Sequence, residues 1–378
     1  MKDFLKIFVI FFIFFVFVFA GALLAIFYDG KEFHDPIVLD ENMEYEKNNE
    51  NIEDIKKDEN IENIEENVDE KEKDNTIKIS FAGDCTLGNY DGSAYAYSFL
   101  HVLEEQSNDY AYFFKKVRPV FQNDDLTLVN LETPLTNSTE KDDKEFAFKG
   151  DPSFVNILKA GSIEMVNISN NHIYDYSQKG FLDTIENLKK SDIYYSGEGH
   201  IAYYNVKDMT IASIGYRGWG TYIKTHLKKD IKEAKEKADI VLVSFHWGDE
   251  NKYYPNDVQK TLGRFAIDEG ADVVVGHHPH VIQGIEKYKD KYIVYSLANF
   301  CFGGNRNPKD KDTFIFQAEF AIDNKKITNI QGNIIPCSVS SVKHVNNYQP
   351  VILEGEEKER VLNRIYYYSS GLEYGISR

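Results

Sequence analysis

Three clusters of imidazole and amide side chains each follow a short apolar run with the composition of a β-strand: Asn170-Asn171-His172 after residues 163–168, Ser244-Phe245-His246-Trp247-Gly248 after residues 240–243, and Gly276-His277-His278-Pro279-His280 after residues 273–275. In an open α/β sheet, ligands bind at the edge where the carboxyl ends of parallel strands meet. Imidazole is the commonest metal ligand and carries protons near neutral pH. The clusters therefore predict an α/β fold with a metal centre at that edge, suited to hydrolytic chemistry.

Residues 76–345 carry the pattern of one α/β domain, because strand-like runs alternate with amphipathic helical stretches. The expected strands are residues 77–81, 126–131, 163–168, 210–214, 240–245, 272–275 and 292–296. The expected helices are residues 113–121, 178–190, 230–237 and 256–269. A hairpin should close one edge of the sheet, formed by residues 313–320 and 326–335. We assign residues 346–378 to a C-terminal tail, in which residues 360–369 fit either a helix or a strand.

The first residues are predicted to lie outside this domain. Residues 7–27 form an uncharged apolar run, which as a helix would span about 32 Å, the thickness of a bilayer's hydrocarbon layer. We favour a retained anchor in residues 1–28 over a cleaved signal peptide, whose apolar core is usually shorter. Lys2 and Lys6 precede the run. The positive-inside rule then predicts a single-pass protein of the cell membrane, with a cytoplasmic N-terminus and an extracellular globular domain.

Residues 29–75 are interpreted as an acidic, low-complexity linker. Within residues 41–74 there are 15 Asp or Glu and five Lys, a local charge of 5 − 15 = −10 out of −18 for the whole chain. A segment of this composition cannot bury a core. Its acidity argues against nucleic acid and anionic lipid as partners.

The three cysteines do not predict a disulfide framework. Cys85, Cys301 and Cys337 are few and odd in number, and none has Cys-x-x-Cys spacing. We expect them to be small buried hydrophobic residues, with a Cys301–Cys337 disulfide as the open alternative.

Carboxylates add to the three clusters at the ends of the first two expected strands. Asp84 follows the first strand and Glu132 follows the second. Five successive strand ends then offer candidate ligands: Asp84, Glu132, Asn171 or His172, His246, and His278 with His280. Mixed carboxylate, amide and imidazole ligands suit Mn, Fe or Zn better than Ca or Mg. The sequence therefore predicts one or two divalent ions, and His277 is expected to point away from them.

Residues from 76 to about 337 resemble the CapA family of capsule-synthesis proteins, a branch of the calcineurin-like metallophosphoesterases associated with poly-γ-glutamate capsules. The resemblance rests on these motifs: Gly83-Asp84, Asn130-Leu131-Glu132-Thr133-Pro134, Ser169-Asn170-Asn171-His172 with Asp175, His246-Trp247-Gly248 with Glu250, Gly276 with His278-Pro279-His280, and Tyr295-Ser296-Leu297-Ala298-Asn299-Phe300. It implies a sandwich of two packed β-sheets flanked by helices.

The resemblance also implies a role for each matching residue. Asp84 and His280 would bind a first metal ion, and Glu132 would stand at the position of the bridging carboxylate. A second ion would be held by the remaining ligands, Asn171, His246 and His278. His172 would act as a general acid towards the leaving oxygen, and Asp175 would orient His172.

Two positions depart from the phosphoesterase pattern. Thr86 stands where that pattern has a histidine, and Glu132 stands where it has an aspartate. Both changes bear on the first metal site. A one-metal centre, and a site that binds metal without fast turnover, therefore stay open.

The leading functional hypothesis is a membrane-anchored, extracellular CapA-like protein of capsule, poly-γ-glutamate or envelope polymer biogenesis. It would use a metal-bound hydroxide for hydrolysis or transfer, with an anionic polymer or phosphoester as substrate and other capsule-synthesis membrane proteins as partners. The alternatives are an extracellular phosphodiesterase or nucleotidase, and a non-catalytic, metal-binding accessory subunit of a polymer synthesis or export complex. Arg217 follows another strand, so it fits either an anion-binding role or an exposed turn.

Overall fold

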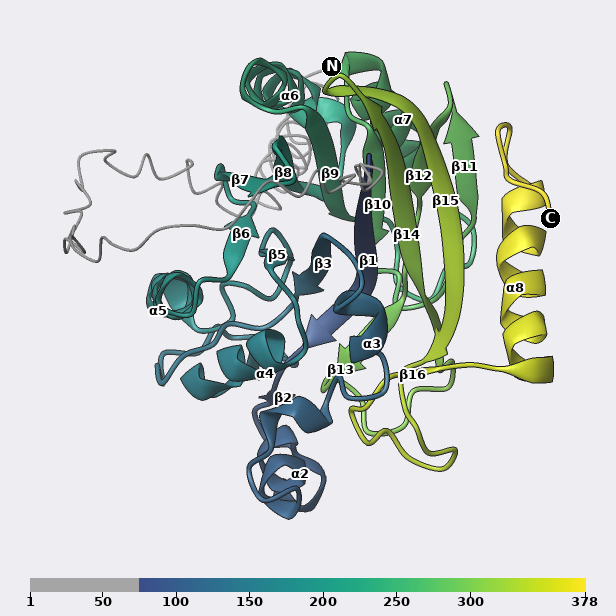
Figure 1. The fold of residues 1–378 in the computed structure, drawn as a ribbon. Coiled ribbons are helices and arrows are strands. Elements are labelled where there is room, and N and C mark those ends of the chain that lie inside the picture. Colours follow the sequence, from purple (N-terminus) through teal and green to yellow (C-terminus); the bar gives the residue numbers. More distant parts are fainter. Residues whose placement is uncertain (1–74) are drawn as a thin grey trace, which may run out of the picture. The chain divides into compact units, whose positions relative to one another are not determined.

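The computed structural model describes residues 75–378, which fold around two large β-sheets (Figure 1). The first sheet has the strand order β16 (Val351–Ile352), β15 (Lys326–Ser338), β14 (Asp312–Asp323), β1 (Thr76–Thr86), β3 (Leu126–Leu131), β5 (Met165–Asn167) and β6 (Tyr194–Ser196), with β13 (Asn299–Phe302) paired to β1. The second has the order β11 (Ile285–Tyr288), β12 (Lys291–Val294), β10 (Val273–His277), β9 (Ile240–Trp247), β8 (Met209–Gly218) and β7 (Ile201–Val206). A small ribbon pairs β2 (Asn89–Tyr90) with β4 (Phe148–Lys149).

The helices are short to medium in length. They are α2 (Phe99–Glu105), α3 (Arg118–Phe121), α4 (Val155–Ala160), α5 (Ser177–Lys190), α6 (Lys224–Lys237), α7 (Asp257–Glu269) and α8 (Gly355–Ser370). Single 3₁₀ turns lie at Tyr95–Tyr97, Tyr110–Tyr112, Pro152–Phe154 and Thr221–Ile223. The α/β class predicted from the sequence is confirmed.

Alternating apolar side chains place the two sheets face to face. In β9, Ile240 and Leu242 belong to the cluster between the sheets, together with Leu126 and Leu128 of β3. Val241, the neighbour of Ile240, belongs instead to the cluster that packs against α6 and α7. Successive side chains of a strand point to opposite faces, and a strand covered on both faces reads as a continuous apolar run. This arrangement explains why β9 is buried along its whole length.

The outer faces of both sheets are covered by helices. The cluster on the outer side of the first sheet includes Leu103 of α2, Phe121 of α3, Ile157 of α4 and Leu188 of α5. The outer side of the second sheet is covered by α6 and α7. The C-terminal residues 346–378 include β16, which pairs with β15, and α8, which lies beside β15 and β11 (Figure 1). The α8 side chains of Val361 and Ile365 join the core between the sheets.

Most predicted strands and helices are present, with shifted ends. The predicted hairpin is formed by β14 and β15, which pair antiparallel, and residues 360–369 lie in a helix, α8. The helix predicted for residues 113–121 is helical only at Arg118–Phe121. All three cysteines are buried and free, so Cys301 and Cys337 form no disulfide in the described structure.

The predicted localisation, a single-pass membrane protein with an extracellular globular domain, is contradicted and needs correction. Among residues 75–378, no helix is long and apolar enough to cross a bilayer. The longest helix in this range, α8, has 16 residues, and its first turn carries Glu356 and Glu357. The run at residues 7–27, on which the prediction was based, lies outside the described residues.

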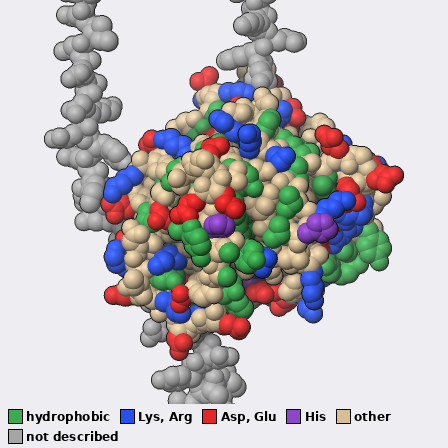
Figure 2. All heavy atoms as spheres, turned by 90° about the horizontal axis from the view of Figure 1, so that it is seen from below, with side chains coloured by type: hydrophobic (Ala, Val, Ile, Leu, Met, Phe, Trp, Pro, Cys, Tyr) green, Lys and Arg blue, Asp and Glu red, His purple; other side chains and the backbone are tan. Residues whose placement is uncertain are grey.

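The surface seen from below carries a mixture of side chains (Figure 2). Histidine reaches this surface beside acidic side chains, and basic and apolar side chains are scattered around them. Basic and acidic side chains are therefore interspersed on this face of the molecule. This is also the side towards which β1 and β3 run in Figure 1.

Candidate metal centre

Asp84 lies at the centre of a buried polar cluster near the end of β1. Its Oδ1 accepts a hydrogen bond from Asn130 Nδ2 at 2.8 Å, and its Oδ2 lies 3.3 Å from His280 Nδ1. The backbone N–H of His278 also donates to Oδ2, at 3.3 Å. The preceding residue, Gly83, has no room for a side chain, because a β-carbon there would overlap the carbonyl group of Ala298. Strand ends from both sheets therefore converge on one carboxylate.

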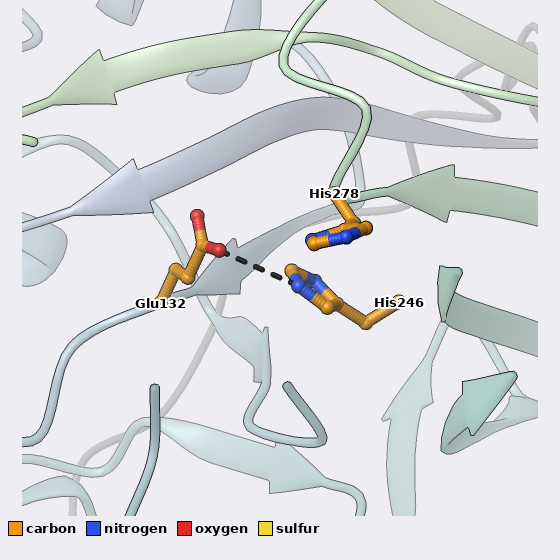
Figure 3. Close-up of side chains that lie close together, drawn as sticks. All are labelled: Glu132, His246 and His278. Atoms are coloured by element: carbon orange, nitrogen blue, oxygen red, sulfur yellow. Dashed lines mark ion pairs between the residues drawn. The ribbon is translucent and has the colours of Figure 1, made fainter. Parts of the chain in front are cut away.

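A second group of ligand atoms is formed by Glu132, His246 and His278. One ligand atom from each lies within 4.8 Å of the others. Figure 3 shows the carboxylate of Glu132 directed at the ring of His246, with the ring of His278 beside it. Glu132 Oε1 lies 3.4 Å from His246 Nε2, and the two imidazole centroids are 4.7 Å apart. Asn171 joins this group, because its Oδ1 lies 2.6 Å from His246 Nε2.

Glu132 links this group to a second set of ligand atoms. Asp84, Glu132 and His280 also have ligand atoms within 4.8 Å of one another. All six residues predicted as metal ligands are thus brought together, from β1, β9 and the loops after β3, β5 and β10: Asp84, Glu132, Asn171, His246, His278 and His280. Glu132 belongs to both sets.

The residues present fit a divalent ion. In the described part of the chain, Glu132 Oε1 and His278 Nδ1 are buried without a hydrogen-bond partner. Leaving such a group unsatisfied costs about 1–3 kcal/mol. His278 and His280 also have positive φ values of 94° and 58°, a conformation that costs on the order of 1–3 kcal/mol for a residue other than glycine. A cation between these groups would satisfy the open lone pairs.

Burial and nearby charges shift the pKa values of the three imidazoles in different directions. Burial lowers the pKa of His246 well below its ordinary value, with His278 adding to the shift. Burial likewise lowers the pKa of His278 to about 4. For His280, burial opposes the charged form, but Glu132 and Asp84 outweigh it and raise the pKa to about 10. His246 and His278 are therefore neutral at pH 7, the form that binds metal, whereas His280 must first lose a proton.

The pKa values of the two carboxylates are shifted in opposite directions. Burial, followed by the charge of Asp84, raises the pKa of Glu132 well above its ordinary value. Burial would also raise the pKa of Asp84, but the hydrogen bond and charge of His280 outweigh it and lower this pKa. Two carboxyl groups in one buried site cannot both ionise without a compensating positive charge. A divalent cation would provide that charge.

His172 and Asp175 lie together beside the ligand cluster. His172 Nδ1 is 2.8 Å from Asp175 Oδ2, which also accepts from the N–H of Phe148 at 2.6 Å. Burial lowers the pKa of His172, partly offset by Asp175. Lys144 is a member of this group that the sequence did not indicate: it forms an ion pair with Asp175, and its Nζ donates to the Asn171 carbonyl at 3.0 Å.

Arg217 of β8 pairs in register with His246 of β9, and its side chain is held by an ion pair. Its Nη2 is 2.8 Å from Glu198 Oε2, and its side chain is 39% exposed. Glu198 also accepts hydrogen bonds from Ser169 at 2.8 Å and Tyr174 at 3.1 Å. The structure therefore holds the guanidinium in an ion pair near the loop that carries Asn171.

Three further residues near the cluster differ from the sequence interpretation or were missed by it. His277 was expected to point away, but it is fully buried with Nδ1 3.5 Å from Asp84 Oδ1, so that expectation is wrong. Asn130 bonds Asp84 and lies 3.3 Å from His246 Nδ1. Trp219 covers the cluster, with its ring 4.8 Å from that of His278. A polar residue inside an apolar strand could have drawn attention to Asn130.

Comparison with solved structures gives distant matches. A hypothetical protein from Thermus thermophilus aligns with a TM-score of 0.43 and 14% identity, covering 69% of this chain and 99% of that one.

Sequence comparison is more informative. The PGA biosynthesis protein CapA of Bacillus subtilis (strain 168) is 35% identical over 253 residues, 61% of this chain and 64% of the relative. The capsule biosynthesis protein CapA of Bacillus anthracis is 31% identical over 264 residues, 61% of each chain. The matched segment thus spans less than two thirds of these relatives. The family model described as bacterial capsule synthesis protein PGA_cap matches residues 78–304, more than half of this chain. The chain therefore belongs to the PGA_cap family of bacterial capsule synthesis proteins.

Proposed function

We propose that this protein is a metal-dependent hydrolase or transferase of capsule or poly-γ-glutamate biosynthesis, acting on a phosphoester or a related bond of an anionic substrate. The observation that carries the proposal is the buried set of carboxylate, amide and imidazole ligands, in which Glu132 Oε1 and His278 Nδ1 have no hydrogen-bond partner within residues 75–378. Membership of the PGA_cap family supports the biosynthetic role.

The ligands divide into two sets that share Glu132. Asp84 and His280 would complete one set, and Asn171, His246 and His278 the other. We propose Mn, Fe or Zn as the ion, because these metals accept carboxylate and imidazole together. When bound, such an ion supplies Lewis acidity, which polarises an ester oxygen and lowers the pKa of water.

His172 is proposed as the proton-transfer group. Asp175 lies 2.8 Å from His172 Nδ1, which favours the tautomer with a proton on that nitrogen. Nε2 is then the atom that exchanges a proton with a leaving oxygen. Lys144 offsets the charge of Asp175, and its hydrogen bond to the Asn171 carbonyl ties its own segment to the loop that carries His172. Together these residues would hold the imidazole in one orientation.

Thr86 favours a second candidate, a metal-binding accessory subunit without turnover. Thr86 offers only a hydroxyl, and its Oγ1 lies 3.5 Å from Glu132 Oε2. The first set therefore lacks the imidazole that the phosphoesterase pattern has there. A protein of this kind would bind metal and assist other capsule-synthesis proteins.

Hydrolysis of a chromogenic phosphodiester by the full-length protein, with added Mn²⁺, separates these candidates. We compare the wild type with His246→Ala, and use His226→Ala, an exposed histidine of α6, as the matched control. Turnover that is lost in His246→Ala and kept in His226→Ala supports the enzyme. Metal binding without turnover on any phosphoester, together with complementation of a capsule-deficient strain by His172→Ala, supports the accessory subunit.

A further inference from the structure

Glu250 forms a third set of ligand atoms with His278 and His280. It lies in the turn after β9, and its carboxylate and the two imidazoles offer atoms within 4.8 Å of one another. Glu250 is exposed, whereas His278 is only 8% exposed. His278 Nδ1 has no hydrogen-bond partner among the residues that the structure describes. A buried, unsatisfied imidazole thus faces a carboxylate that approaches from the solvent side.

The main chain ties the Glu250 turn directly to the histidine loop. The N–H of Asn251 donates to the carbonyl of Pro279, the residue between His278 and His280, at 2.8 Å. One residue further on, the carbonyl of Lys252 accepts from Gln283 Nε2 at 2.8 Å. Gln283 is fully buried and itself accepts a hydrogen bond from a glutamine of α7. These bonds fix the backbone beside Glu250 relative to the two imidazoles.

The C-terminal helix braces the same turn. The rings of Tyr253 and Tyr368 of α8 are stacked, with centroids 5.4 Å apart and an interplanar angle of 19°. Tyr254 meets the same ring edge-on at 5.5 Å. Tyr253 OH also donates to Asp310 Oδ2 at 3.2 Å, and Asp310 is paired with Arg364 of α8 at 2.7 Å. The brace therefore includes residues beyond 78–304, the segment matched by the family model.

We propose that Glu250 is an additional metal ligand, which reaches the metal centre beside His278 and His280 from the solvent side, and that Tyr368 positions its loop. The inference rests on the proposed metal centre. A third carboxylate adds an oxygen donor to a site where Thr86 supplies only a hydroxyl. Because Glu250 is exposed, an anionic substrate group can displace it without disturbing the buried ligands. The loop would thus hold the ion until substrate arrives.

Mn²⁺ titration of the metal-free, full-length protein by calorimetry tests the ligand role. We compare the wild type with Glu250→Gln, which keeps the shape and removes the charge, and with Glu236→Gln, an exposed glutamate of α6, as the control. The expected result is a loss of Mn²⁺ affinity of roughly 10- to 100-fold in Glu250→Gln, the range found when residues that support a metal site are changed. The Glu236→Gln variant should bind like the wild type.

The outcomes separate the two proposals. Equal affinity in Glu250→Gln and the wild type overturns the ligand role and leaves the metal centre standing. No Mn²⁺ uptake by the wild type overturns the metal centre, and the ligand role with it. An equal loss of affinity in Glu236→Gln would attribute the effect to general surface charge and also overturn the proposal.

Hydrogen exchange at the amide of Asn251 tests the brace separately. Tyr368→Ala should speed this exchange and weaken Mn²⁺ binding. Tyr368→Phe keeps the ring, so its exchange rate and its Mn²⁺ affinity should match those of the wild type. Unchanged exchange in Tyr368→Ala would overturn the positioning role of α8. Lys358→Ala, an exposed position near the start of α8, controls for a general effect on the helix.

Discussion

The inner and outer halves of the candidate metal centre are built differently. The inner half, Asp84, Glu132 and His246, is fully buried at the ends of β1, β3 and β9. The outer half is carried by loops and includes Lys144, 31% exposed at its side chain, and the exposed Glu250. A buried charge that loses its partner costs far more than an exposed one. Changes in the inner half should therefore affect both folding and metal binding, whereas changes in the outer half should leave folding largely unaffected.

Asp84→Ala should have the largest effect. It removes the carboxylate that accepts hydrogen bonds from Asn130 and the His278 amide and pairs with His280. We expect a loss of about 3–5 kcal/mol in the free energy of unfolding, typical of breaking a buried pair, and loss of bound metal. Urea denaturation and elemental analysis measure the two. If Asp84→Ala keeps the wild-type stability and the full metal content, then Asp84 is needed neither for folding nor for metal binding, which would contradict its place in the inner half.

Glu132→Gln should separate folding from metal binding within the inner half. Neutral glutamine removes the repulsion between Glu132 and Asp84, which contributes to the raised pKa of Glu132. The metal-free protein should therefore gain stability, while its affinity for Mn²⁺ falls. Thermal denaturation with and without Mn²⁺ gives both values. A metal-free variant that is less stable than the wild type would contradict the proposed repulsion.

His172→Ala should impair chemistry and leave the inner half intact. Loss of a positioned proton donor lowers turnover by roughly 10²- to 10⁴-fold. Metal content should stay at the wild-type level, because His172 belongs to none of the three sets of ligand atoms. The assay is phosphodiester turnover beside elemental analysis, with His226→Ala as the control. Metal loss in His172→Ala would place this residue in the inner half instead.

Arg217→Ala should have the smallest effect. The variant breaks a partly exposed pair with Glu198, which contributes under about 1 kcal/mol of stability. Metal content should not change, and we expect little change in KM. A KM for an anionic substrate that rises more than tenfold, with kcat unchanged, would instead assign Arg217 to substrate binding.

The sequence predicts the sheets well where the pattern is local. β3 begins and ends at the predicted residues, because its apolar run is covered on both faces. The edge strand β7 was missed, since only one of its six residues is buried and its apolar pattern is weak. The helix predicted from residue 113 begins only at Arg118, next to Pro119. Proline has no N–H to donate, so it is accommodated in the first turn of a helix but not in its interior.

The candidate site is predictable where ligands sit at strand ends, and less so where tertiary packing delivers them. Asp84, Glu132 and His246 could be predicted, because they lie at or just after the ends of strands that the sequence shows. Lys144 comes from a long connection without a periodic pattern, so only packing could reveal its contact with Asp175. The orientation of His277 was predicted wrongly. His277 lies on the same face of β10 as Val273 and Val275, and this face packs against the other sheet, so its ring lies near Asp84.

The most direct test of the metal centre is the metal content of the full-length protein after dialysis against Mn²⁺, wild type against Glu132→Ala, with folding verified by circular dichroism. Glu132 is the residue shared by the two buried sets of ligand atoms. We predict one or two ions per chain in the wild type and a content near zero in the variant. A folded wild type without bound metal, or a variant that retains the wild-type content, would contradict the metal centre.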